Sequence, residues 1–110
     1  MESKDAVTAL AALAQESRLA VFRLLVQAGP EGLAPGEIGE RLGIPAPTLS
    51  FHLKALSHAG LIEDRRDGRY IFYSARYAQM NELLGFLTKN CCGGRSCAPQ
   101  AAPARRRKVS

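Results

Sequence analysis

The stretch GIPAPTLSFHLKALSHAGLIEDRRDGRYIFY, residues 43–73, decides how the rest of the chain is expected to fold. Its first part, residues 46–59, has leucines at i, i+4 and i+7, which gives it one apolar face and predicts a helix. The leucines are Leu49, Leu53 and Leu56. Gly60 follows this run, and glycine adopts the left-handed conformation that ends helices at little cost. The sequence therefore predicts a short helix that stops at Gly60.

A β-hairpin is predicted directly after this helix. Asp67-Gly68 lies between two strand-like runs, residues 61–66 and 69–74. Asp-Gly between such runs is a strong hairpin signal, because a tight primed turn needs positive φ at both central residues. A helix, a glycine stop and an arginine-rich hairpin together suggest a winged helix-turn-helix.

Four further helices are expected around this stretch, and they complete the predicted fold. Residues 35–42 would form the first helix of the motif, with residues 43–45 as its turn. Apolar periodicity predicts the others at residues 5–14, 17–27 and 77–89. The expected class is mainly α with a small β-hairpin: a winged helix-turn-helix of about five helices and a two-stranded wing.

The apolar positions of these helices predict what each one packs against. In residues 17–27, three side chains are expected to point inward with Leu25 beside them: Leu19, Phe22 and Val26. In residues 35–42 the core side chains would be Ile38 and Leu42. The first and last helices carry the stripes Val7, Leu10, Ala11, Ala14 and Met80, Leu83, Leu84, Leu87. Such stripes are typical of a core or of a dimer interface.

Residues 49–73 resemble the recognition helix and wing of the ArsR family (ArsR/SmtB), small bacterial arsenic- and metal-responsive repressors. The most specific parts are HLKAL, AGLI and R-x-G-R-x-x-x-Y, which runs from Arg66 to Tyr73. QESRLAVFRLL also resembles the family's second helix, in which an Arg-Leu pair, here Arg18-Leu19, precedes the core. The resemblance covers roughly residues 6–90. It implies a DNA-binding domain that forms a homodimer through its first and last helices.

Several side chains are expected to contact double-stranded operator DNA, because they are of types that bind base edges and phosphates. On the predicted recognition helix they are Pro47, Thr48, Ser50, Phe51, His52 and Lys54. Thr48, Ser50, Phe51 and His52 are the candidates for base contacts, and the Phe51 ring suits a thymine methyl group. In the wing, Arg65, Arg66 and Arg69 would bind the DNA backbone or minor groove.

The recognition helix is expected to begin without a side-chain cap. Its opening, Pro45-Ala46-Pro47, has prolines where a serine or asparagine would usually satisfy an amide. The exposed amides would then face a DNA phosphate, or the prolines simply stiffen the turn.

Composition sets limits on the class of protein and its location. The 110 residues suit one domain, and Arg105 to Lys108 supply four of the five net positive charges, so overall charge alone is a weak sign of DNA binding. No apolar run approaches the roughly 20 residues that span a bilayer, and the opening MESKDAV lacks a signal-peptide core. A cytoplasmic protein with no membrane partner is expected.

Three segments are expected along the chain. Residues 1–90 would form the DNA-binding and dimerisation domain, and residues 91–97 a cysteine segment. Residues 98–110 are rich in alanine, proline and arginine without periodicity, so they are expected to be disordered.

The cysteine segment carries the clearest chemical signal. Cys91, Cys92 and Cys97 lie within seven residues, and Gly93-Gly94 would let the chain fold back between them. Clustered cysteines in a cytoplasmic protein favour metal binding or reactivity, and three soft thiolates suit trivalent arsenic or antimony better than four-coordinate zinc. Some arsenic-responsive members of the resembled family also carry a Cys-Cys pair and a third cysteine beyond the last helix. Arsenite or antimonite is the expected inducer, with no organic cofactor.

Other site types of the resembled family are missing from this sequence. A Cys-x-Cys site would fall in residues 33–38, which contain no thiol, and zinc sensors use histidines and acids on the last helix, where only Glu82 is found. A thiol redox switch, another soft metal, or inert cysteines remain alternatives.

The sequence thus predicts a homodimeric repressor that leaves its operator when a metalloid binds, with recognition helices in successive major grooves roughly 34 Å apart. A metalloid-buffering protein would need the cysteines but not the wing arginines. An enzyme such as a thiol-dependent arsenate reductase is not expected, because Cys91-Cys92 follows the C-terminal end of a helix, which is the wrong end of the dipole to lower a thiol pKa.

Overall fold

The structure, a computed structural model, describes residues 1–94. It confirms the predicted fold class, with five α-helices and one two-stranded antiparallel hairpin among these residues. The elements in chain order are α1 (Ser3–Leu13), α2 (Glu16–Ala28), α3 (Pro35–Leu42), α4 (Ala46–His58), β1 (Ile62–Asp67), β2 (Tyr70–Ala75), α5 (Tyr77–Thr88) and the 3₁₀ turn η1 (Cys91–Gly94). None of these helices has the length and apolar character to cross a membrane.

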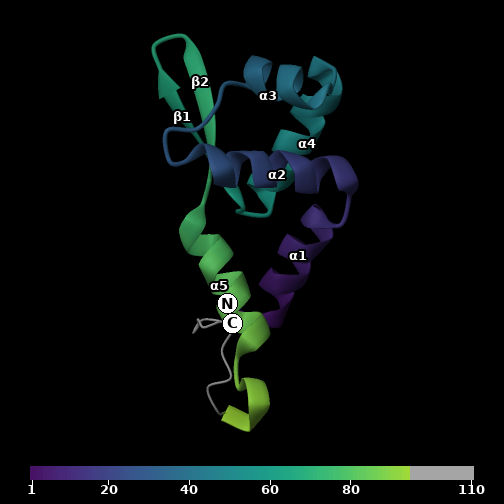
Figure 1. Cartoon of the computed structure of the whole chain (residues 1–110), viewed down its shortest axis with the longest axis vertical. Coiled ribbons are helices and arrows are strands. Elements are labelled where there is room, and N and C mark those ends of the chain that lie inside the picture. The colour runs from purple at the N-terminus through teal and green to yellow at the C-terminus, as the bar shows by residue number, and fades with distance from the viewer. Residues whose placement is uncertain (95–110) are drawn as a thin grey trace, which may run out of the picture.

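The helices and the hairpin divide the molecule into two regions. Figure 1 shows α2, α3, α4 and the hairpin packed together at one end, while α1 and α5 extend away from them toward the other end. We call the first region, residues 16–75, the DNA-binding half, and we call α1 with α5 and η1 the helical end. The two termini of the described fold belong to the helical end.

The core is built mainly by the DNA-binding half. Its largest fully buried side chains are Val21, Leu25, Ile38, Leu56 and Leu61. The predicted leucine stripe of α4 is confirmed, since all three leucines are buried. Burying one such side chain stabilises the fold by about 1.5–3 kcal/mol, so this stripe is a main reason why α4 has a fixed orientation.

The inward face of α2 differs from the prediction. Leu19 is 44% exposed, whereas Val21 is fully buried beside Phe22 and Leu25. At about 100° per residue, the buried arc of α2 is centred near Leu25, and Leu19 lies about a third of a turn away from it. Apolar spacing alone did not show which arc would meet α4.

The turn between α3 and α4 forms as the sequence predicts. Gly43 ends α3 in the left-handed conformation with φ of +67°. Pro45 is the N-cap of α4, and no side chain caps this end. The first backbone bond of α4 runs from the Leu49 N–H to the Pro45 carbonyl at 2.8 Å. Prolines therefore pre-set the entry of the helix in place of a capping side chain.

The hairpin is confirmed, but its turn is shifted by one residue. Asp67 pairs with Tyr70, so Gly68 and Arg69 form the two-residue loop. Gly68 has φ of +66°, whereas positive φ outside glycine occurs within residues 1–94 only at Asn90 and Cys92. Asp67 is thus the last strand residue, and the expected positive φ at both Asp67 and Gly68 is wrong. Some two-residue turns need positive φ only at the first of their two central residues, and here glycine occupies that position.

The base of the wing is fixed to the loop before α3. Leu33 and Tyr73 exchange two backbone hydrogen bonds, each 2.9 Å long, outside the two named strands. Gly32 precedes this bridge with φ of +78°, and a Cβ there would lie 2.3 Å from the Tyr73 carbonyl oxygen. Only glycine fits this close approach of two backbones.

The helical end leaves large apolar side chains on its surface. Helix α1 buries only alanines, at positions 6, 9 and 12, while Val7 and Leu10 are exposed. Helix α5 buries Leu83 but leaves two leucines 54% exposed, Leu84 and Leu87. The predicted stripes are present, but their largest members do not enter the core of this chain.

Candidate nucleic-acid interface and cysteine site

The outward side of α4 carries most of the side chains predicted to contact DNA. Five of the six predicted residues on this helix are exposed: Pro47, Thr48, Ser50, Phe51 and Lys54. Phe51 is 68% exposed, which is unusual for a large aromatic side chain on a helix whose other face is buried. One helix therefore presents hydroxyl, aromatic and cationic groups together, and these are the groups that bind bases and phosphates.

His52 is the exception, and its predicted base contact is wrong for this fold. Its side chain is only 7% exposed, and its Nδ1 lies 3.3 Å from the Nε of Arg18 on α2. His52 follows Leu49 by three residues and precedes Leu56 by four, so it belongs to the buried stripe rather than to the outer face. The burial of His52 could have been predicted from this spacing, but its hydrogen bond to Arg18 could not.

The wing arginines differ in how they are held. Arg65 donates from Nη2 to the Glu31 carbonyl at 3.0 Å, and its guanidinium lies 4.8 Å from the centre of the Phe72 ring. It also lies 4.0 Å from the Asp67 carboxylate. The bond to Glu31 joins the wing to the loop before α3 and the other two contacts lie within the wing, so Arg65 has a structural role in the free protein.

Arg66 and Arg69 are exposed, and within residues 1–94 neither makes a side-chain hydrogen bond or ion pair. Arg66 pairs across the hairpin with Ile71, on the opposite face of the strand from Arg65. Arg69 lies in the turn at the tip. Both guanidinium groups are therefore available to an anionic partner without breaking a contact in the described fold.

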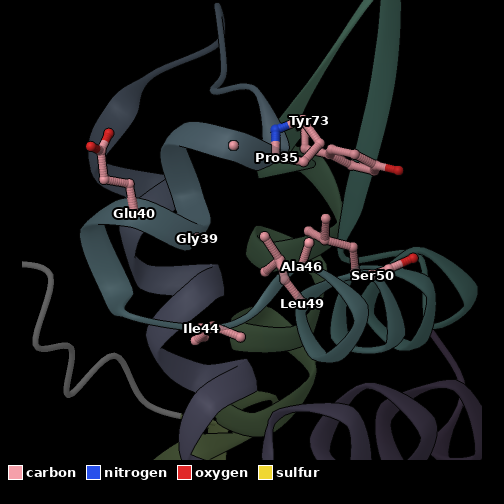
Figure 2. A pocket seen from close by; sticks show the side chains of 10 residues that line it. Pro35, Gly39, Glu40, Ile44, Ala46, Leu49, Ser50 and Tyr73 are labelled. Atoms are coloured by element: carbon pink, nitrogen blue, oxygen red, sulfur yellow. The ribbon is translucent and has the colours of Figure 1, made fainter.

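A cleft of about 650 Å³ lies between α3 and the start of α4, with Tyr73 of the wing at its edge. Figure 2 shows Ile44, Ala46 and Leu49 along it, with Pro35 and Tyr73 beside each other at its edge. The carboxylate of Glu40 points away from the cleft, whereas the Ser50 hydroxyl lies on the Tyr73 side. The lining is mainly apolar, so the cleft itself offers few polar groups to a ligand.

Two of the three predicted metalloid ligands lie together beyond α5. The Sγ atoms of Cys91 and Cys92 are 3.6 Å apart in η1, and neither residue is a free thiol in this structure. Asn90, Cys92 and Gly93 all have positive φ, so the chain turns sharply just after the helix. Positive φ is uncommon outside glycine and costs about 1–3 kcal/mol in strained cases.

Cys97 lies outside the described residues, as do residues 98–110, for which disorder is predicted. Within residues 1–94 no group of three or more His, Cys, Asp or Glu side chains is arranged to hold a metal ion. A three-thiolate site therefore needs Cys97 as its third ligand.

Comparisons with known proteins agree with this geometry. A model described as a helix-turn-helix domain matches residues 13–65. The chain is 44% identical over 77 residues to an uncharacterized HTH-type transcriptional regulator, YceK of Bacillus subtilis, covering 69% of this chain and 76% of that protein. An ArsR-like transcriptional regulator from Rhodococcus sp. RHA1 superposes with a TM-score of 0.72 at 28% identity, covering 78% of each chain.

A second solved structure bears on assembly. The homodimeric winged helix-turn-helix DNA-binding domain of a possible ArsR-family regulator from Mycobacterium bovis superposes with a TM-score of 0.63 at 26% identity. The match covers 86% of this chain and 88% of that one. With the fold, the exposed face of α4 and these relatives in agreement, this chain belongs to the ArsR family of winged helix-turn-helix transcriptional regulators.

Proposed function

We propose that this protein is a homodimeric cytoplasmic repressor that leaves its operator when trivalent arsenic or antimony binds Cys91, Cys92 and Cys97. The observation that carries the proposal is the position of the sulfur pair. Cys91 and Cys92 lie directly beyond α5, a helix whose outer leucines have no cover in the described chain. A ligand at this position acts on the same helix that is expected to form the dimer.

The chemistry of the donor set fits a metalloid. Thiolates are soft ligands, and three of them suit trivalent arsenic or antimony, whereas structural zinc sites usually take four ligands. Cys91 and Cys92 already lie within 3.6 Å of each other between their sulfur atoms. Binding them alone closes no new loop, so Cys97 is the ligand that constrains the chain.

Release of DNA by a bound metalloid requires two states of the protein that differ in their affinity for DNA. The apolar side chains of α1 and α5 support a dimer through these helices, as does the likeness to a domain described as homodimeric. A dimer sets the distance between its two α4 helices, and a change at the end of α5 alters that distance. A small misfit is enough to weaken simultaneous binding to two half-sites.

The test is operator binding measured by fluorescence anisotropy on the DNA upstream of the gene, in reducing buffer and titrated with arsenite. The Cys97→Ser protein should bind this DNA as the parent does and should not be released by arsenite. Cys91→Ser and Cys92→Ser should give the same result. A Ser96→Ala protein is the matched control and should respond like the parent. Release of all three Cys→Ser proteins at the parent's arsenite concentration would exclude this site as the sensor.

A thiol redox switch is the second candidate, because oxidation joins nearby thiols and the sulfur atoms of Cys91 and Cys92 lie 3.6 Å apart. Oxidation and metalloid binding would both constrain the segment after α5. Titration with a mild oxidant in place of arsenite separates the two. If oxidant releases the DNA and arsenite does not, the redox switch is correct and the metalloid proposal is wrong.

A further inference from the structure

The only buried polar or charged side chain within residues 1–94 is that of His52. A buried imidazole without a hydrogen-bond partner destabilises a fold, so natural proteins either pair such a group or replace it by an apolar one. Leucine would continue the stripe of α4 at this position. The imidazole is therefore present for a reason other than packing, and its hydrogen bond to Arg18 indicates the reason.

The chemistry of arginine fixes the state of this imidazole. A guanidinium group has only donors and stays protonated, so the Nδ1 of His52 must accept from the Nε of Arg18. The proton of a neutral imidazole then lies on Nε2. One charged side chain of α2 thus selects one tautomer and one ring orientation on α4, which Figure 1 shows packed beside α2.

The backbone of Arg18 is fixed at the start of α2. It lies in the first turn of α2, where the side-chain Oε1 of the N-cap residue Gln15 accepts from its backbone N–H at 2.9 Å. A cation in the first turn opposes the helix dipole, so Arg18 does not favour the start of α2. Its placement is explained by what its side chain reaches.

The imidazole also lies next to the ring of Phe51, the residue before it on α4. The two rings meet edge to face, with centroids 6.5 Å apart and an angle of 61° between their planes. Phe51 is the large exposed side chain on the outer face of α4. Contacts therefore run without a gap from the start of α2 through a buried imidazole to an aromatic ring on the DNA-facing side.

We infer that Arg18 is a positioning residue for operator selection: through His52 it fixes the orientation of Phe51 and of this turn of α4. The inference rests on the DNA-binding part of the proposed function, with Phe51 as a contact to a base. Arg18 acts on the choice of sequence rather than on overall affinity for DNA. This separates it from Arg66 and Arg69, whose expected contacts are with phosphates.

The test compares specific and non-specific DNA for Arg18→Lys, using the upstream operator fragment and a scrambled duplex of the same length. Lysine keeps the charge but lacks the planar Nε–H donor. The ratio of the two affinities should fall about tenfold, as for coupled neighbouring residues. The dependence of binding on salt should stay unchanged. A salt slope that falls by about one with an unchanged ratio would mean that Arg18 binds a phosphate, and the inference would be wrong.

His52 supplies a matched pair of variants. Asparagine places an acceptor near the position of Nδ1, so His52→Asn should retain most of the parent's ratio. His52→Leu, which removes the acceptor, should match Arg18→Lys. The control is His58→Gln on the same helix, where the imidazole is exposed and no loss is expected. Equal ratios for His52→Asn and His52→Leu would overturn the role of the hydrogen bond.

Nitrogen NMR gives a readout that does not depend on DNA. The chain has two histidines, so His58 serves as an internal reference. The His52 ring should show a protonated Nε2 and an unprotonated Nδ1, and this pattern should weaken toward a tautomer mixture in Arg18→Lys. An unchanged His52 spectrum in that variant would overturn the inference even if its operator binding were reduced. Failure of the parent to prefer the operator would instead count against the proposed function.

Discussion

The DNA-binding half and the helical end differ in how far one chain completes them. In the DNA-binding half, five large apolar side chains are fully buried, the wing is bonded to the loop before α3, and the polar side chain of His52 has a partner. In the helical end, α1 contributes only alanines to the core, and α5 exposes two of its leucines. The DNA-binding half buries its large apolar side chains within its own chain, whereas the helical end leaves several of its own exposed. The cysteine pair lies in the helical end, directly beyond α5.

The sharpest test of this difference compares leucines in the two regions. Leu56→Ala removes a fully buried side chain from the DNA-binding half and should lower the free energy of unfolding by about 2–5 kcal/mol. Leu87→Ala is the control in the helical end and should change it by less than about 1 kcal/mol at low protein concentration. Urea unfolding at fixed protein concentration measures both. Equal losses would contradict the division into two regions.

The second test adds a charge to the helical end. Leu84→Asp should convert a dimer to a folded monomer, because a carboxylate would be buried in the proposed interface. Operator affinity should fall about a hundredfold, since the two half-sites would no longer be bound together. Sedimentation velocity and anisotropy measure the two effects. Asn81→Asp adds the same charge on an exposed polar position of α5 and is the control. If the Leu84→Asp protein remains a dimer, this part of α5 does not belong to the interface.

The third test loosens the DNA-binding half at its backbone contact. Gly32→Ala should lower stability by about 1–3 kcal/mol, because the residue has positive φ and the new methyl group would meet the Tyr73 carbonyl. Gly36→Ala is the control, since nothing lies within 4 Å of its added Cβ and alanine favours the helix. Thermal unfolding distinguishes them. A Gly32→Ala protein as stable as Gly36→Ala would show that the wing is not fixed at this point.

The smallest expected effect concerns the outer surface of the wing. Arg66→Ala should weaken binding to specific and scrambled DNA alike, about threefold, and lower the slope of log affinity against log salt by about 0.9. Arg41→Ala is the control, because that arginine is exposed on α3 and pairs with Glu37 at 2.7 Å. Unchanged salt dependence for Arg65→Ala, Arg66→Ala and Arg69→Ala would count against a wing that contacts DNA.

The parts of the fold that follow from local chemistry could be predicted from the sequence. The leucine stripe of α4, the left-handed glycines after α3 and α4, and the hairpin itself each depend on a few neighbouring residues. The positions that were wrong depend on contacts between distant segments. Leu19 is exposed because α2 presents a different arc to α4, and His52 is buried because Arg18, 34 residues away, supplies its partner.

The candidate site was predictable to the same extent. The proximity of Cys91 and Cys92 follows from their adjacency, and the exposed groups of α4 follow from the helical period. The structural role of Arg65 could not be predicted from the sequence. Its main partner is the carbonyl of Glu31, which lies in a loop whose position hydrophobic periodicity does not predict. Which arginine is braced and which is available is decided by tertiary contacts alone.

The bridge between Leu33 and Tyr73 also bears on how such regulators can acquire new operators. Paired backbones bring the beginning and the end of residues 33–73 side by side, so this segment enters and leaves the rest of the protein at nearly one place. Segments with adjacent ends are exchanged between proteins most easily. A donor segment would need to match the faces of α1 and α2 that pack against it, including a partner for Arg18. We expect recombination at these two points to transfer operator choice while the helical end is inherited unchanged.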